Sequence, residues 1–170
     1  MQAVELDGVG SAEWEAVLAG EQQAFGGVGE ELSWARKTRH VAVLGDDGVP
    51  LALAGAMIGR VAVAEGQPFP VVGIGGVIVT RAMRGRGMAR LVLEAILDVA
   101  RELGPERAML FCRERLTTLY ARFGFHLIES PVTAEQPSGR LIVPMRAMWA
   151  PLADGAGWPA GEVEVLGEPF

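Results

Sequence analysis

Cysteine, histidine and aromatic residues are scarce in this sequence of 170 residues. Its single cysteine, Cys112, excludes an internal disulfide and any metal cluster built from cysteine ligands. The two histidines, His40 and His126, are far apart in the sequence, so we expect no histidine-rich metal site. Because aromatic residues make up only 6% of the chain, the core must consist mainly of aliphatic side chains.

Positive charge is also scarce. Fifteen Lys and Arg residues against 21 Asp and Glu residues give a net charge of -6. Such a chain repels a phosphate backbone, which argues against a general nucleic-acid binder, and it attracts cations such as amines. Lys37 is the only lysine, so the other fourteen basic residues are arginines.

Long hydrophobic runs are absent. The longest one, residues 51–64, has fourteen residues and contains Arg60, so it is too short to span a bilayer. The first residues lack the basic start and the apolar stretch of a signal peptide. We therefore expect a cytoplasmic protein that does not enter a membrane.

Apolar residues are nevertheless numerous enough for a folded domain. They make up 50% of the chain, and a chain of this length typically buries roughly 70% of its unfolded surface. The sequence contains no internal repeat and no evident linker. We expect one domain over residues 1–170, with a core over 41–146 and a C-terminal tail, residues 151–170, rich in Gly, Pro and acidic residues.

Hydrophobic periodicity and turn residues predict a mixed α/β structure. The clearest element is a helix over residues 88–103, whose apolar side chains recur at spacings of three and four. Further helices are expected after the N-cap Ser11 and over residues 30–37 and 116–123. Strands are expected over residues 40–44, 49–64, 71–79, 107–112, 125–128 and 140–146. Residues 46–48 are a predicted hairpin turn, and residues 65–70 and 130–139 are predicted loops.

Arginines and glycines gather in the segment that joins strand 71–79 to helix 88–103. Gly85 and Gly87 let the backbone approach an oxygen closely, and a helix N-terminus favours negative charge. Four of the fourteen arginines lie here, at positions 81, 84, 86 and 90. The expected ligand is a pyrophosphate; the alternatives are a solvated arginine-rich turn and a local RNA-binding stretch. The spacing fits neither a P-loop nor the G-x-G-x-x-G dinucleotide pattern.

Two motifs resemble the signatures of one family, the GNAT N-acetyltransferases. Arg84-x-x-Gly87-x-Ala89, preceded by Val77-x-Val79, resembles the family's acetyl-CoA signature. Leu119-Tyr120, followed by Gly124-Phe125, is similar to its second signature. The resemblance covers roughly residues 41–146. It implies a single-domain α/β (α+β) fold with a twisted, mostly antiparallel mixed sheet flanked by helices, in which the strands around Val79 and Cys112 splay apart to admit the pantetheine arm of the cofactor.

The resemblance also implies roles for individual residues. Backbone groups of the stretch Val77, Ile78 and Val79 would hold the pantetheine of acetyl-CoA as an added strand would. The pyrophosphate would be held by Arg84, Gly85, Arg86, Gly87, Met88 and Ala89. Tyr120 matches the tyrosine that protonates the departing thiolate: its reference pKa of about 10 exceeds the value of about 8.5 for a thiol, so it stays protonated and can act as general acid. The alternative for Tyr120 is an aromatic packed in the core.

Three positions are informative about the rest of the chemistry. Arg113 stands where the family often has an asparagine, which leaves one cofactor contact open. Cys112 has no evident base near it in the sequence, so we interpret it as a small buried strand residue rather than a nucleophile. Some relatives place a glutamate on the strand before the signature, but residues 73–76 read Gly-Ile-Gly-Gly. The general base is therefore not identified on this strand.

The C-terminal tail offers a candidate for that base. Residues 158–163 and 167–170 resemble the ending of aminoglycoside 2'-N-acetyltransferases and of nodulation-type N-acyltransferases. In the former an aromatic residue carries the terminal carboxylate near the acceptor, a catalytic part that Phe170 could play. Glu162, Glu164 and Glu168 could add negative potential for a polycationic substrate. The alternative is a tail that is disordered or only covers the structure.

Three functions follow from the resemblance. The first is transfer of an acetyl group from acetyl-CoA to a primary amine of a small molecule, with aminoglycosides and other amino sugars among the candidates, by direct attack and without a metal. The second is acetylation of a protein or peptide amine, and the third is a non-catalytic acyl-CoA-binding module. The sequence leaves the acceptor, the acyl chain length and the formation of a homodimer open.

Overall fold

The described residues before α2 are mainly in β-strands. The computed structural model describes residues 1–6 and 31–170. The first strands are β1 (Ala3–Leu6), β2 (Arg39–Leu44), β3 (Pro50–Val63) and β4 (Phe69–Val79). β2, β3 and β4 correspond to the strands predicted over 40–44, 49–64 and 71–79, whereas the sequence pattern does not indicate β1. The turn predicted at residues 46–48 joins β2 to β3, with Gly48 at a φ of 78° and its N–H donating to the Gly45 carbonyl at 3.0 Å.

No helix forms over residues 31–37, so the helix predicted over 30–37 is wrong. This stretch instead bonds to distant parts of the chain. The Ala35 N–H donates to the Pro169 carbonyl at 2.8 Å, and the Ser33 N–H donates to Gln136 Oε1 at 2.7 Å. These tertiary hydrogen bonds outweigh the local helix preference. The helix predicted after Ser11 lies outside the described residues.

The second part of the chain alternates helices and strands. Its helices are η1 (Arg81–Met83), α2 (Met88–Glu102), η2 (Glu114–Leu116) and α3 (Thr117–Ala121). Its strands are β5 (Arg107–Cys112), β6 (His126–Leu127), β7 (Val132–Ala134), β8 (Leu141–Ile142), β9 (Arg146–Pro151) and β10 (Val163–Val165). The predictions over 88–103, 107–112, 116–123 and 125–128 correspond to α2, β5, α3 with η2, and β6.

Two predictions in this part are wrong. The predicted loop over 130–139 contains β7, and residues 140–146 are not one strand but β8, a break and the first residue of β9. Pro144 lies in the break. Proline interrupts a strand because it lacks an N–H and restricts the residue before it. β9 then pairs along the full length of β5, from Cys112↔Arg146 to Arg107↔Pro151. β9 therefore begins at Arg146, the residue at which the strand predicted over 140–146 ends.

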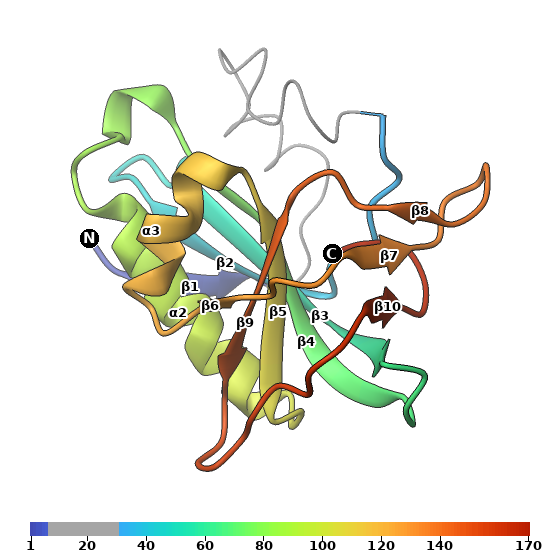
Figure 1. Ribbon diagram of the computed structural model, residues 1–170. Helices are drawn as coiled ribbons and strands as arrows, with labels where there is room; N and C mark the ends of the chain where they lie inside the picture. Colours follow the sequence, from blue (N-terminus) through green and yellow to red (C-terminus); the bar gives the residue numbers. More distant parts are fainter. Residues whose placement is uncertain (7–30) are drawn as a thin grey trace.

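The described residues form one ten-stranded sheet with helices against one face (Figure 1). The hydrogen-bonded order is β6-β9-β5-β4-β3-β10-β7-β8, and β2 pairs with β3 and β1 with β2. β4 and β5 are parallel, as are β10 and β7, and the other pairs are antiparallel. The mixed, mostly antiparallel sheet expected from the sequence is confirmed.

Hydrophobic clusters pack on both faces of this sheet. β5 alternates between two of them: Leu110 and Cys112 join the cluster beneath α2, whereas Met109 and Phe111 join the cluster on the other face. The stripe that α2 buries consists of Met88, Val92, Leu93, Ile96, Leu97, Val99 and Ala100. The other cluster includes Phe170 from the C-terminal tail. The sheet thus separates the side of α2 from the side of Phe170.

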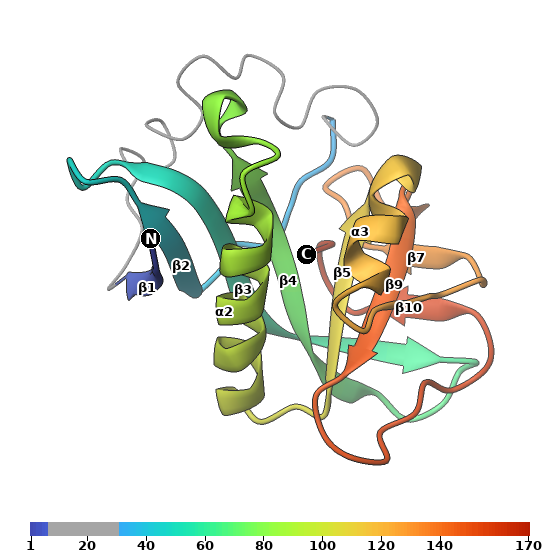
Figure 2. The same ribbon diagram turned by 90° about the vertical axis from the view of Figure 1, so that its left-hand side faces the viewer.

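A β-bulge in β4 opens the middle of the sheet. The ladder between β4 and β5 ends at Ile74↔Leu110. On the other edge of β4, the pairing moves from Gly55↔Gly75 to Leu53↔Ile78, so β4 carries one residue more than β3 over this step. Gly76 adopts a φ of 61° within the bulge, a conformation that glycine adopts readily. Beyond this point β4 and β5 diverge, and Figure 2 shows the C-terminal end of the chain between them.

Candidate active site

The loop between β4 and α2 ends at the N-terminus of α2. Gly87 is the N-cap of α2 with a φ of 83°, and no side chain caps this end. The first N–H groups of a helix have no partner within the helix. A Cβ added to Gly85 or Gly87 would meet nothing within 4 Å, so the space over the loop is open. This donor set and this open cradle fit a pyrophosphate group.

The predicted arginines surround the same loop. Arg81, Arg84 and Arg86 are exposed, and Arg84 also braces the loop, because its Nε donates to the Val79 carbonyl at 3.2 Å. Arg90 forms an i,i+4 ion pair with Glu94 at 2.8 Å. The positive charge predicted for an anion site is therefore brought together at the start of α2, where guanidinium groups can make charge-assisted hydrogen bonds to phosphate oxygens.

Val79 directs its peptide groups away from β3. The Thr80 N–H donates across to β3, to the Leu51 carbonyl, at 2.9 Å. Residues that bond to one neighbour alternate along a regular antiparallel strand, so Ile78 also bonds to β3, whereas Val79 does not. The Val79 carbonyl accepts from Arg84 Nε at 3.2 Å. Val77 lies next to the bulge, where this alternation is interrupted.

Tyr120 lies on α3 beneath the helical face of the sheet. Its side chain is only 6% exposed and packs edge-on against Phe125, with ring centroids 5.9 Å apart. Burial raises the pKa of the Tyr120 phenol, and the neighbouring Cys112 thiol adds to that shift. A phenol in this environment keeps its proton at neutral pH and can donate it. The structure shows Tyr120 packed in the core, and its role as general acid stays a prediction.

Cys112 is the buried strand residue that the sequence predicts. It is the last residue of β5, is 2% exposed, and its Sγ lies 3.8 Å from Met148 Sδ. Burial raises the pKa of the Cys112 thiol to about 11, and the nearby Glu114 carboxylate contributes in the same direction. A thiol with this pKa is protonated at neutral pH and is a poor nucleophile.

The Phe170 ring occupies the surface that the glycines of β3 and β4 leave free. Phe170 is 3% exposed, and a Cβ on Gly59 or Gly73 would collide with its ring. The ring also packs against Phe111 of β5, with centroids 6.2 Å apart. Phe170 therefore lies across β3, β4 and β5, and the absence of larger side chains on this part of β4 has a steric reason.

The carboxyl end of Phe170 lies over Gly75, close to the point where β4 and β5 separate. A Cβ on Gly75 would be 3.1 Å from the Phe170 carbonyl carbon and also 3.1 Å from Lys37 Nζ. Lys37 Nζ donates to the Ala35 carbonyl at 2.8 Å, and burial lowers the pKa of Lys37 to about 8. The stretch of β4 without an acid is thus covered by the Phe170 backbone carbonyl group and by Lys37.

The C-terminal tail is an ordered part of the sheet. β10 lies between β3 and β7, and the Leu166 N–H donates to the Arg60 carbonyl at 2.9 Å. Glu164 forms an ion pair with Arg140 at 2.5 Å, and Glu168 accepts a hydrogen bond from the Ser33 hydroxyl. Two of the three tail carboxylates considered for a polycationic substrate therefore have partners within the protein.

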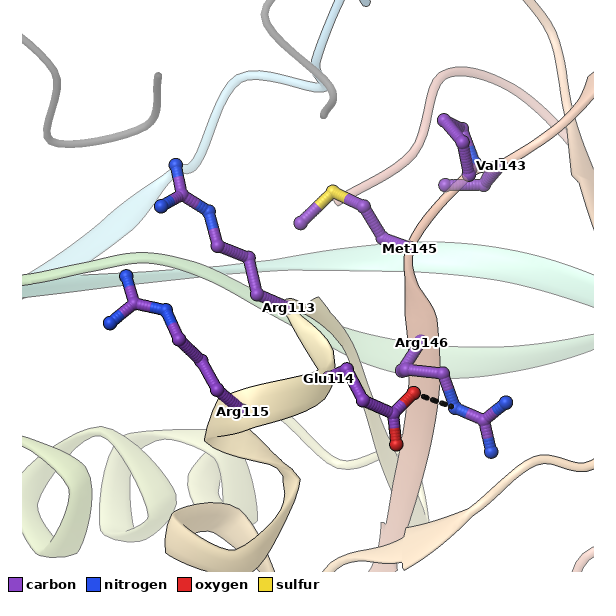
Figure 3. A pocket seen from close by; sticks show the side chains of 7 residues that line it. Arg113, Glu114, Arg115, Val143, Met145 and Arg146 are labelled. Atoms are coloured by element: carbon purple, nitrogen blue, oxygen red, sulfur yellow. Dashed lines mark ion pairs between the residues drawn. The ribbon is translucent and has the colours of Figure 1, made fainter. Parts of the chain in front are cut away.

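Sequence reasoning did not find an open pocket of about 620 Å³ at the end of β5 (Figure 3). It is lined by Arg113, Glu114, Arg115, Val143, Pro144, Met145 and Arg146. Glu114 forms an ion pair with Arg146, at 3.3 Å between Oε2 and Nε. The only sequence signal for this pocket is Arg113, which departs from the asparagine of the family pattern. The sequence does not reveal the rest of the lining, because residues 143–146 come next to β5 only through the pairing of β9.

Neither a metal cluster nor a membrane-spanning helix occurs among residues 1–6 and 31–170. No group of three or more His, Cys, Asp or Glu side chains in these ranges is placed to hold a metal ion. No helix in the same ranges is long and apolar enough to cross a membrane.

Comparison with known families identifies the family of this chain. A model of the acetyltransferase (GNAT) family matches residues 10–125. The chain belongs to the GNAT family. It is therefore an N-acetyltransferase that depends on acetyl-CoA.

Solved GNAT structures share the fold of this chain. The GNAT N-acetyltransferase YhbS of Escherichia coli, solved in complex with CoA, is 21% identical with a TM-score of 0.66, over 99% of this chain and 96% of that chain. A GCN5-related N-acetyltransferase of Kribbella flavida is 22% identical with a TM-score of 0.57, over 88% and 97% of the two chains. The ribosomal-protein-S18-alanine N-acetyltransferase of Escherichia coli is 16% identical with a TM-score of 0.56, over 92% and 100%. No curated protein matches the chain.

Proposed function

We propose that this GNAT enzyme acetylates a primary amine of a small molecule by direct attack, with the Phe170 carboxylate as general base and Tyr120 as general acid. The observation that carries the proposal is the position of the Phe170 carboxyl group over Gly75, on the stretch of β4 that has no acid of its own. This position is beside the divergence of β4 and β5, where the resemblance implies that the pantetheine arm enters.

The residues around the start of α2 would hold the cofactor. Acetyl-CoA, when bound, supplies the acetyl group as an activated thioester. The pyrophosphate would be held by the loop and helix residues Arg84, Gly85, Arg86, Gly87, Met88 and Ala89. The strand edge at Val77 and Val79, from which β5 has diverged, would bond to the pantetheine, and Ile78 keeps that edge fixed to β3. These assignments are supported by the uncapped N-terminus of α2 and by the open space over Gly85 and Gly87.

A base is needed because alkyl amines are protonated at neutral pH. An amine with a pKa of about 10 is neutral in only about one part in a thousand at pH 7, which corresponds to roughly 4 kcal/mol. The Phe170 carboxylate can accept the amine proton, directly or through one water molecule. The Lys37 side chain lies over the same glycine, and its Nζ donates to the Ala35 carbonyl at 2.8 Å.

An acid is needed on the other side of the reaction. When the acetyl carbon forms its bond to the amine nitrogen, the carbon–sulfur bond breaks and the sulfur must take up a proton. The Tyr120 phenol is protonated and lies beside Cys112 at the end of β5, on the face of α2. Retention of a buried, protonated phenol at this place supports a catalytic protein over a non-catalytic acyl-CoA-binding module.

The C-terminal tail supports a small-molecule acceptor. Phe170 is buried and β10 is part of the sheet, so the tail covers part of the face that an open groove for a protein or peptide amine would need. The argument for a polycationic acceptor is weaker, because Glu164 and Glu168 have internal partners. Three further statements stay predictions: the acceptor is an aminoglycoside or another amino sugar, the protein is cytoplasmic, and it forms a homodimer.

Release of CoA in the presence of a broad panel of small amines tests the proposal. We expect acetyl-CoA to raise the melting temperature of the protein and at least one amine to accelerate CoA release. In Gly87→Glu the added carboxylate would repel the pyrophosphate, so the variant should lose the thermal protection by acetyl-CoA. Gly157→Ala is the control, because it adds a methyl group in open space far from this loop. Protection by acetyl-CoA without acceleration by any amine would contradict the proposed function.

A further inference from the structure

Two paired glycines make room for the side chain of Lys37. Gly55 of β3 and Gly75 of β4 lie opposite each other in the sheet. A Cβ added to Gly55 would be 2.7 Å from both Cβ and Cγ of Lys37. A Cβ added to Gly75 would be 2.8 Å from Cε of the lysine and 3.1 Å from its Nζ. The sheet therefore lacks side chains at the two positions that the lysine stem and its amine occupy.

Hydrogen bonds hold the backbone and the amine of this lysine in place. The Thr38 N–H donates to the Ala56 carbonyl of β3 at 2.9 Å, and the Ala35 N–H donates to the Pro169 carbonyl at 2.8 Å. Lys37 Nζ donates to the Ala35 carbonyl at 2.8 Å. A lysine that is free on the surface would keep its rotamer freedom. Here the fold instead fixes the amine over β4.

The amine of Lys37 lies where the sheet opens. The ladder between β4 and β5 ends at Ile74 of β4, so Gly75 is the first residue beyond it, and the bulge at Gly76 follows. The acetyl end of acetyl-CoA, entering between the two strands as proposed above, would reach the other face of the sheet at this point. Lys37 Nζ is therefore the amine of the protein itself that is placed to meet the thioester.

Part of this amine is neutral at neutral pH. Burial lowers the pKa of Lys37 to about 8, so about one tenth of it is neutral at pH 7, against less than about one part in a thousand for an ordinary lysine. A neutral amine that donates to the Ala35 carbonyl keeps a lone pair for attack. The charged and titratable groups around it are Arg36 in the same segment, His40 of β2 and the carboxyl group of Phe170.

We propose that Lys37 Nζ is itself an acetylation site of this enzyme: without an amine acceptor, it takes the acetyl group of acetyl-CoA bound to the same chain. The Nζ lone pair attacks the acetyl carbon, a carbon–nitrogen bond forms and the carbon–sulfur bond breaks. The sulfur takes up a proton, for which Tyr120 is the proposed donor, and Nζ releases one to solvent. The products are free CoA and a neutral acetyl-lysine. The inference shares the cofactor position of the proposed function but needs no external acceptor.

Incubation of the full chain with isotopically labelled acetyl-CoA, without any amine, tests the proposal. The experiment starts from protein whose Lys37 carries no acetyl group, and peptide mass spectrometry then locates the label. We expect up to one labelled acetyl group per chain, on Lys37 and not on the Met1 amino group. The first-order rate constant should not depend on protein concentration. Because Lys37 is the only lysine in the sequence, no other lysine competes for the label.

Variants separate the catalysed reaction from chemical labelling. Gly87→Glu retains Lys37 but should not bind acetyl-CoA, so we expect labelling to be at least about 10-fold slower, because the bound thioester no longer lies near the amine. An excess of free CoA should suppress labelling of the wild type in the same way. Gly157→Ala, with its methyl group in open space, should be labelled at the rate of the wild type. Lys37→Arg should not release CoA in a burst of one equivalent.

Three results would overturn the inference. One is the absence of label on Lys37 while acetyl-CoA still raises the melting temperature. Another is labelling that neither Gly87→Glu nor free CoA slows, which would be a purely chemical reaction. The third is a rate constant that rises with protein concentration, which would indicate transfer between chains. Because the assay contains no amine, CoA release with the amine panel tests the proposed function separately. If acetyl-CoA gives no thermal protection, both fail.

Discussion

Burial acts in the same direction on the two titratable groups at the end of β5. It raises the pKa of the Tyr120 phenol, and it raises the pKa of the Cys112 thiol to about 11. Both groups therefore keep their protons at neutral pH, but the consequences differ. The thiol is made unreactive as a nucleophile, whereas the phenol is kept in the form that can donate a proton to a departing thiolate.

Removal of the phenol oxygen should affect turnover more than binding. For Tyr120→Phe we expect kcat to fall about 100-fold, the scale of general acid catalysis, with KM for acetyl-CoA nearly unchanged. Cys112→Ala is the matched control, because it alters a buried neighbour without removing the acid. Steady-state kinetics of CoA release measures both variants. A Tyr120→Phe enzyme with the kcat of the wild type would show that the tyrosine only packs in the core.

The burial of Lys37 should make the free energy of unfolding depend on pH. Its pKa is about 8 in the folded protein and about 10.4 in an unfolded chain, so between these values the unfolded chain binds more protons. The free energy of unfolding must then rise with pH in this window because of Lys37. We expect the wild type to gain stability relative to Lys37→Met from pH 8 to 10.4. Cys112 contributes with the opposite sign in both proteins, so the difference isolates Lys37; curves that stay parallel would contradict its burial.

At the scale of elements, glycines allow the C-terminal tail to pack on β3 and β4. Gly59, Gly73 and Gly75 form a flat surface on which the Phe170 ring and the Lys37 side chain lie. The bulge at Gly76 then separates β4 from β5. The same strand pair thus holds the C-terminal tail and opens the edge for the cofactor.

One methyl group on this surface should displace Phe170. In Gly73→Ala the Cβ collides with the ring, and overpacking of this kind costs about 1–3 kcal/mol of stability. We expect a lower melting temperature and a large loss of amine-dependent CoA release, with thermal protection by acetyl-CoA retained. Gly157→Ala, where the methyl group meets open space, should match the wild type. Full activity of Gly73→Ala would mean that the ring position is not needed.

The elements that the sequence predicts correctly are those with a clear local pattern. The apolar stripe of α2 and the apolar runs of β3, β4 and β5 are visible as patterns in the sequence. The arginine–glycine loop is visible there as a local cluster of these two residue types. The break at Pro144 and the start of β9 depend on pairing with β5, and residues 31–37 depend on bonds to Pro169 and Gln136. The contact of Phe170 with Gly73 joins residues almost a hundred positions apart, so only the fold reveals why β4 lacks an acid.

At the scale of the whole molecule, the sheet divides the two halves of the reaction. The loop proposed for the pyrophosphate and Tyr120 belong to the face of α2, whereas Phe170 belongs to the other face. The two faces communicate where the pairing of β4 and β5 ends. An amine held on one face can therefore meet a thioester that enters from the other.

The most direct test of this account moves the Phe170 carboxylate and keeps the Phe170 ring. One glycine appended after Phe170 displaces the carboxylate by up to about 3.5 Å. We predict that kcat for the best amine at pH 7 falls about 100-fold or more, that acetyl-CoA still raises the melting temperature, and that activity recovers in part at pH 9 and above, where more of the amine is neutral. An unchanged kcat at pH 7 would contradict the central claim that the Phe170 carboxylate is the base.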